Sequence, residues 1–293
     1  MIQIRSVSVS LLALTALLVG QPTPVPAEGR PLTEQSPAPA VTTVALSGID
    51  WSQVEPSFAD LSGVFDLPRD RADAWLEPER FTDCLKVSCI ALTFDDGPLP
   101  GHTDRLLEIL AEHEVSATFF VVGRMVNNYP ELLQAAIAAG HEIAGHSYSH
   151  ARLTELGSES LHRDFERTNQ AIKDVSGDYP SYFRPPYGMH NQRVRDAAQQ
   201  PTVMWSIDPQ DWRKANSASD LARYVLARAH PGAIVLMHDS HAKTATALPE
   251  IILGLREQGY ELVTVAEILG PSLNPQAVYR SGLTPPPSDP AAE

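Results

Sequence analysis

Short apolar runs alternate with amphipathic stretches between residues 89 and 269. The short runs are bounded by turn residues and predict strands at 90–94, 117–122, 142–145, 182–184, 202–207, 233–237 and 260–264. Helical periodicity predicts helices at 103–113, 130–139, 158–175, 192–199, 218–229 and 248–257. Strands separated by helix-length segments indicate an α/β fold of parallel βα units, and about seven such strands favour a closed or nearly closed barrel.

Clusters of polar residues follow several of the predicted strands. They read TFDDGP at 93–98, HSYSH at 146–150, RPPYG at 184–188, DPQDW at 208–212 and LMHD at 236–239. In a parallel barrel the carboxyl ends of the strands lie on one face, where such folds carry their chemistry. We therefore expect these clusters to converge.

His146 and His150 are separated by three residues and can present both imidazoles to one metal ion. Asp96 is the best candidate for a third ligand, and three ligands would leave an open coordination position for water. A histidine pair at this spacing also occurs often by chance. The acid pair expected at the same face of the barrel favours a metal site.

The spacing is not the H-E-x-x-H pattern of a zinc protease, because no Glu lies between the two histidines, so a general base must come from elsewhere. Asp95 and Asp96 are adjacent where a strand ends, and their side chains should diverge. One carboxylate can then bind metal while the other faces the water. The alternative is a solvated Asp-Gly turn, which the buried strand before it disfavours.

Taken together, the five polar clusters resemble the ordered motifs of the polysaccharide deacetylase family, the NodB-homology group or carbohydrate esterase family 4. The resemblance covers residues 89–269 and implies a distorted (β/α) barrel with fewer than eight strands. It also implies one divalent metal, zinc in preference to cobalt or a similar ion, held by Asp96, His146 and His150. The expected reaction is removal of N-acetyl groups from N-acetylglucosamine residues of a polysaccharide.

The same resemblance suggests catalytic roles for five residues. Asp95 would be the general base, with Arg184 paired to it. The backbone N–H of Tyr187 would help to stabilise the oxyanion. His238 would be the general acid, oriented and kept charged by Asp211. The alternatives are an ordinary surface arginine for Arg184 and a core histidine bonded to backbone for His238.

Trp212 and Leu236, beside Tyr187, would line an apolar slot for the acetyl methyl group, unless they are simply core residues. We assign no role to Asp208 or Asp239. Histidines outside the motifs, among them His241, are expected to be surface or structural residues.

Peptidoglycan is the favoured substrate, because the protein is expected to be exported, carries no recognisable chitin-binding repeat and resembles bacterial envelope deacetylases. Chitooligosaccharide or acetylxylan deacetylation with the same site is the alternative. A catalytically silent carbohydrate-binding protein is disfavoured, because binding alone would not need both the base Asp95 and the acid His238.

The segments outside the motif region predict an exported protein. Arg5 followed by a short apolar run indicates a signal peptide at 1–27, with an uncleaved membrane anchor as the alternative. A Pro-rich linker at 28–40, an irregular lead-in at 41–83, a catalytic domain at 84–270 and a disordered Pro-rich tail at 271–293 would follow. We expect a secreted or cell-wall-associated protein.

The two cysteines, Cys84 and Cys89, are expected to form a disulfide, because one close pair in an exported protein does not make a thiolate metal site. The net charge of −14, with no cluster of Lys and Arg, disfavours nucleic acid as a partner. Nothing indicates a stable protein partner, so we expect a monomer that binds peptidoglycan or a chitin-like polysaccharide.

Overall fold

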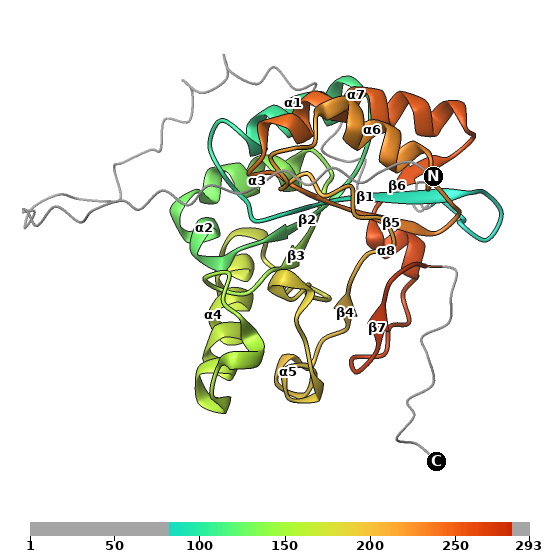
Figure 1. Cartoon of the computed structure of the whole chain (residues 1–293). Coiled ribbons are helices and arrows are strands. Elements are labelled where there is room, and N and C mark those ends of the chain that lie inside the picture. Colours follow the sequence, from blue (N-terminus) through green and yellow to red (C-terminus); the bar gives the residue numbers. More distant parts are fainter. Residues whose placement is uncertain (1–81, 283–293) are drawn as a thin grey trace, which may run out of the picture. The chain divides into compact units, whose positions relative to one another are not determined.

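The computed structural model describes residues 82–282 (Figure 1). The predicted signal peptide, the linker, the lead-in up to residue 81 and the last residues of the tail, 283–293, lie outside the described residues. Among the described helices none is both long and apolar enough to cross a membrane.

The strand β1 (Cys89–Asp95) is buried along its whole length and forms the centre of the sheet. It pairs in parallel with β5 (Ala233–His238) along one edge. Its other edge pairs with β6 (Glu261–Val263) near the start and with β2 (Thr118–Val121) near the end. The strand β2 in turn pairs with β3 (Glu142–Gly145). A run of apolar residues without alternation, as in β1, is what a parallel strand covered on both faces requires.

Single bridges extend this sheet into a barrel. Phe183 bridges both Gly145 of β3 and Thr202 of β4 (Thr202–Val203), and Ile207 bridges Val235 of β5. Parallel pairing therefore runs from β5 through β1, β2 and β3 to residues 202–207 and back to β5. The predicted α/β fold, a distorted (β/α) barrel of parallel strands, is confirmed.

Helices cover the sheet and contribute most of its apolar core. Figure 1 shows α1, α6 and α7 together along the upper side of the sheet, where Leu110, Val225 and Ile251 are fully buried in the main core. The helices are α1 (Thr103–Glu112), α2 (Gly123–Asn128), α3 (Pro130–Ala138), α4 (Ser158–Ser176), α5 (Gln192–Ala198), α6 (Ala218–Leu226), α7 (Ala242–Glu257) and α8 (Val265–Leu269), with short 3-10 turns η4 (Leu153–Glu155) and η5 (Pro186–Gly188).

Several boundaries differ from the predictions. The predicted strand at 182–184 is reduced to one bridging residue, Phe183, and α7 begins at Ala242 rather than at 248. Pro249 lies inside α7, although proline normally favours the first turn of a helix. The expected disordered tail is wrong for residues 271–282, because β7 (Val278–Tyr279) pairs in parallel with β4 and Gly282 donates a hydrogen bond to Gly232.

The predicted disulfide between Cys84 and Cys89 is present. Cys89 is the first residue of β1 and is almost completely buried, whereas Leu85 in the loop between the cysteines is exposed. The bond therefore ties the last part of the lead-in to the central strand.

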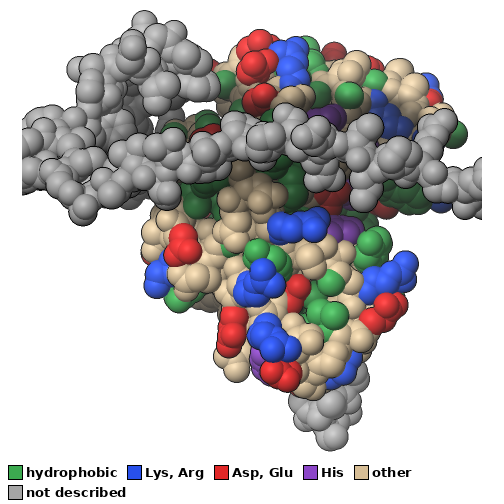
Figure 2. Space-filling model, turned by 90° about the vertical axis from the view of Figure 1, so that its left-hand side faces the viewer, with side chains coloured by type: hydrophobic (Ala, Val, Ile, Leu, Met, Phe, Trp, Pro, Cys, Tyr) green, Lys and Arg blue, Asp and Glu red, His purple; other side chains and the backbone are tan. Residues whose placement is uncertain are grey.

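The face of the molecule shown in Figure 2 carries acidic and basic side chains in mixed order over its described part. Neither sign of charge gathers there into one patch. Interspersed charges of this kind are typical of a solvated surface.

Candidate active site

A cavity of about 460 Å³ lies at the carboxyl ends of the barrel strands. Each of the five polar clusters contributes to its wall, as predicted. The contributions are Asp95 and Asp96, His146 and His150, Pro185 with Tyr187 and Gly188, Asp208 with Trp212, and Leu236 with His238. Trp205 and His241 complete the wall. The convergence of distant segments on one face is confirmed.

Asp96, His146 and His150 place one potential ligand atom each within 4.8 Å of one another. The Nε2 atoms of His150 and His146 lie 3.3 Å and 3.6 Å from Oδ1 of Asp96. This Oδ1 is buried and has no hydrogen-bond partner within residues 82–282. A buried carboxylate oxygen facing two imidazole nitrogens is an unsatisfied arrangement that one cation would complete, so the residues fit a divalent metal.

The orientation of His146 supports that fit. Its Nδ1 lies 2.8 Å from the carbonyl oxygen of Arg184, so Nδ1 carries the proton and donates, and the Nε2 lone pair is left for a metal. Burial lowers the pKa of His146 and keeps the ring neutral, as a ligand must be.

The backbone around the ligands is held in an unusual conformation. Asp96, Ser147 and His150 have φ angles of 86°, 59° and 57°, in the left-handed region that residues with a side chain rarely adopt. Each such residue costs about 1–3 kcal/mol, and such residues cluster at functional sites. The acid pair diverges in its hydrogen bonds, since Asp95 accepts from Arg184 and Asp96 accepts from Ser240, although one oxygen of each carboxylate also lies within 4 Å of Nε2 of His146. This divergence was predicted.

Asp95 is buried and paired with Arg184. Its Oδ1 lies 2.6 Å from Nη1 of Arg184, which also donates to the hydroxyl of Thr93. The remaining guanidinium nitrogens donate to the carbonyls of Val203 and Met204. The alternative of a surface arginine is wrong, because Arg184 is completely buried. Burial raises the pKa of Asp95, and the charge of Arg184 opposes that rise.

His238 and Asp211 form a second charged pair. Nδ1 of His238 lies 2.7 Å from Oδ1 of Asp211, while Oδ2 accepts from the backbone N–H of His238 and from the hydroxyl of Thr244. Burial works against a charged ring at His238. The hydrogen bond to Asp211 and its charge, with the charges of Asp95 and Asp96, outweigh burial and raise the pKa to about 9. The ring of His238 is therefore bonded through Nδ1 to a carboxylate side chain, not to a backbone carbonyl as the alternative had it.

The exposure of the remaining wall residues shows which of them lie in the core. Trp212 is 49% exposed and Tyr187 58% exposed, so neither is a core residue. Leu236 is buried within β5 and also lines the cavity. Tyr187 has a φ of 61° and its ring lies edge-on against His150, with 4.7 Å between ring centroids.

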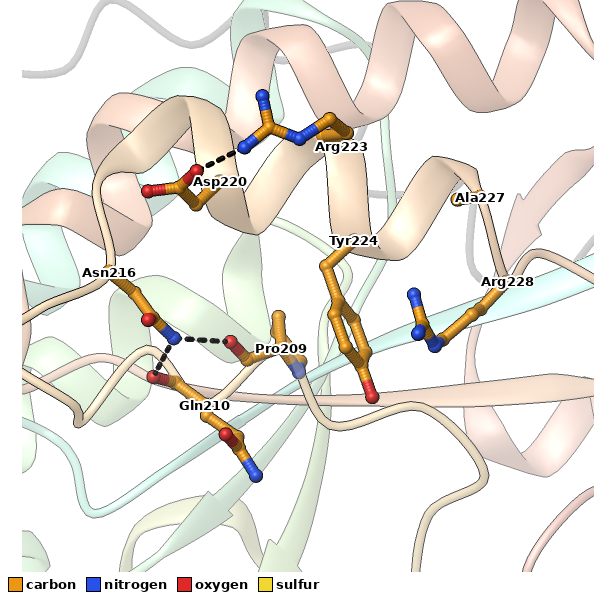
Figure 3. A pocket seen from close by; sticks show the side chains of 8 residues that line it. All are labelled: Pro209, Gln210, Asn216, Asp220, Arg223, Tyr224, Ala227 and Arg228. Atoms are coloured by element: carbon orange, nitrogen blue, oxygen red, sulfur yellow. Dashed lines mark hydrogen bonds and ion pairs between the residues drawn. The ribbon is translucent and has the colours of Figure 1, made fainter. Parts of the chain in front are cut away.

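The loop that carries Asp211 is fixed from its far side. Figure 3 shows the side-chain amide of Asn216 donating to the carbonyls of both Pro209 and Gln210, beside a second cavity of about 490 Å³. Gln210 is left-handed, with a φ of 57°. These bonds hold the turn from which Asp211 reaches His238.

Sequence reasoning missed several contributors to the site, among them His241, Thr244 and Trp205. His241 lines the cavity, with its ring centroid 5.8 Å from that of His238, although it belongs to no motif. Thr244 orients Asp211, and Trp205 forms part of the wall. The only local signal was the position of His241 shortly after the LMHD cluster.

Known proteins share this architecture. The sequence profile for polysaccharide deacetylase matches residues 82–204. The chain is 39% identical over 191 residues to a chitooligosaccharide deacetylase of Rhizobium leguminosarum bv. trifolii, covering 59% of this chain and 88% of that protein. The chain belongs to the polysaccharide deacetylase family. Proteins of this family are metal-dependent, and Asp96, His146 and His150 form a group that can hold one ion.

Other polysaccharide deacetylases match comparably well. A solved structure described as T48 deacetylase with substrate is 38% identical with a TM-score of 0.65, over 68% of this chain and 99% of that one. Peptidoglycan-N-acetylglucosamine deacetylase PgdA of Listeria monocytogenes is 41% identical over 184 residues, or 63% of this chain. The alignment spans only 39% of that Listeria protein.

Proposed function

We propose that this protein is a metal-dependent hydrolase that removes N-acetyl groups from N-acetylglucosamine residues of peptidoglycan. The observation that carries the proposal is the meeting of three units in one cavity. These are the group formed by Asp96, His146 and His150, the Asp95–Arg184 pair, and the His238–Asp211 pair. Amide hydrolysis needs an activated water, a base and an acid for the departing amine, and the three units supply these requirements.

Zinc is the proposed metal, with cobalt as an alternative, because two imidazoles and one carboxylate are a ligand set of catalytic zinc sites. When bound, the metal lowers the pKa of a water molecule to about 7 and polarises the acetyl carbonyl. Asp96, His146 and His150 would hold it.

Asp95 would take the proton from the attacking water. Its Oδ1 is occupied by Arg184, whereas Oδ2 lies 3.8 Å from Nε2 of His146 and so faces the metal ligands. Arg184 holds the carboxylate in that orientation and favours its charged form. One carboxylate oxygen of Asp95 is therefore held in place by Arg184, and the other is available for proton transfer.

His238 would protonate the leaving amine. Its Nδ1 proton is bonded to Asp211, which leaves the Nε2 proton to be donated. Asp211 keeps the ring charged and correctly turned. The backbone N–H of Tyr187 would stabilise the acetyl oxyanion, and Trp212 and Leu236 would accommodate the acetyl methyl group.

Peptidoglycan as substrate is supported by the PgdA similarity and by the leader-like N-terminal sequence. We propose a secreted or cell-wall-associated monomer whose partner is the polysaccharide itself. Chitooligosaccharide deacetylation with the same residues is the second candidate, favoured by the match to the Rhizobium protein. Acetylxylan would use the same machinery. A silent binding protein would not require the buried Asp95–Arg184 pair together with the His238–Asp211 pair.

The test is acetate release by the purified full chain from peptidoglycan, chitooligosaccharides and acetylxylan. Each reaction is run as prepared, after removal of metal with a chelator, and after addition of zinc or cobalt. We expect release from peptidoglycan that the chelator abolishes and zinc restores. Full activity in a sample shown to be free of metal would refute the mechanism, and a preference for acetylxylan would refute the substrate.

A further inference from the structure

Asp239 is a buried acid to which the proposed mechanism gives no task. It follows His238 at the end of β5 and is 2% exposed. No cationic side chain pairs with it in the described part of the chain, and its Oδ1 has no hydrogen-bond partner there. A buried carboxyl group without a counter-ion is costly to keep, so its surroundings indicate what it does.

The hydrogen bonds of Asp239 go to the segment that carries the acid pair. Its backbone N–H donates to the carbonyl of Asp95 at 3.1 Å. Its Oδ2 accepts from the hydroxyl of Thr103 at 2.6 Å, and the same hydroxyl oxygen accepts from the backbone N–H of Leu99 at 2.7 Å. Asp239 thus connects the end of β5 to the beginning and the end of residues 95–103.

Gly97, within that segment, packs directly against the carboxyl group of Asp239. A Cβ built on Gly97 would lie 1.8 Å from Oδ2 of Asp239, closer than any side chain allows. Only glycine lets the backbone after Asp96 approach the carboxyl group so closely. Asp96 itself is left-handed, with a φ of 86°, and such a conformation persists only where its surroundings hold it.

We propose that Asp239 is a positioning residue that braces the turn after β1 and thereby sets the affinity of Asp96, His146 and His150 for the metal. The inference deepens the proposed function and rests on its metal site. Asp239 touches neither ligand nor substrate in this scheme. It acts by keeping the backbone of residues 95–99 in the conformation that points Asp96 at the two histidines.

The bracing depends on shape and hydrogen bonding rather than on charge. Oδ2 of Asp239 accepts the hydrogen bond from Thr103 and packs against Gly97, and no cationic side chain in the described part of the chain pairs with it. An amide of the same shape should replace it, whereas a methyl group should not.

The test measures zinc affinity by titration calorimetry on the full chain for the wild type, Asp239→Asn, Asp239→Ala and Thr103→Val. We expect Asp239→Ala to weaken zinc binding about 10- to 100-fold, the range typical for loss of a residue that supports metal ligands. Thr103→Val should weaken it in the same direction, and Asp239→Asn should stay close to the wild type.

Thr264→Val is the matched control. Thr264 also places a hydroxyl at the start of a helix, where it bonds to Glu267 of α8. This variant should lower the melting temperature and leave zinc affinity unchanged. It separates a general loss of stability from a loss of bracing.

Wild-type zinc affinity in both Asp239→Ala and Thr103→Val would overturn the proposal, as would equal losses in Asp239→Asn and Asp239→Ala. If Asp239→Ala does not fold, Thr103→Val and Asp239→Asn decide the question. The titration needs no substrate. A wild-type protein that binds zinc but releases no acetate would refute the proposed function without contradicting the positioning role of Asp239.

Discussion

The substitution Asp211→Asn offers a quantitative test of the acid role of His238. Asp211 supplies the largest of the effects that raise the pKa of His238 from 6.5 to about 9, against the opposing effect of burial. That rise corresponds to a preference for the charged ring of about 3 kcal/mol. Asparagine keeps the shape of the side chain but not its charge, so burial should then hold the pKa near or below 6.5.

The sign follows from the role of the residue. A general acid works in its protonated form, so His238 should not limit the wild-type rate well below pH 9, and the rate should fall as the pH rises through 9. If the pKa drops to about 6.5, the protonated fraction at pH 8 falls about 30-fold. The expected result is a loss of that size at pH 8 and a much smaller loss at pH 6.

The assay is kcat/KM for acetate release from a chitooligosaccharide between pH 5.5 and 10 at saturating zinc. Asp208→Asn is the control, because Asp208 also lies in the cavity wall but makes no hydrogen bond to His238. Asp208→Asn should shift the alkaline limb of the pH profile far less than Asp211→Asn does. An alkaline limb that stays at the wild-type position in Asp211→Asn would refute the assignment of His238 as the acid.

Three further results are expected. His150→Ala should lose bound metal and activity together, whereas Asp95→Asn should lose activity and keep its metal; metal analysis beside rates decides this, and a metal-free Asp95→Asn would reverse the division of the acid pair. His238→Ala should slow amide hydrolysis by about 10²–10⁴ but affect an activated acetyl ester much less, because that leaving group needs no proton; equal losses would contradict the role. Replacing Cys84 and Cys89 by serine should lower the free energy of unfolding by about 2 kcal/mol in denaturant titrations, and an unchanged midpoint would show that the short loop adds nothing.

Elements with strong local signals could be predicted from the sequence. The apolar run of β1 and the amphipathic period of α1 and α4 were recognised nearly to their ends. The helix α8 was missed although it carries a legible signal, since Thr264 and Glu267 form a capping box. The strand β7 had no such signal, because two residues become a strand only by pairing with β4.

The metal-binding and catalytic candidates could be named from the sequence, because the polar clusters at strand ends are local features that resemble the motifs of a known family, and a parallel barrel brings those ends together. Their contacts were decided only by the tertiary structure. The burial of Arg184 against Asp95, the bond from Thr244 to Asp211 and the packing of Asp239 on Gly97 join segments that are distant along the chain. Such distances depend on how the barrel closes, and closure is a property of all the strands together rather than of any one segment.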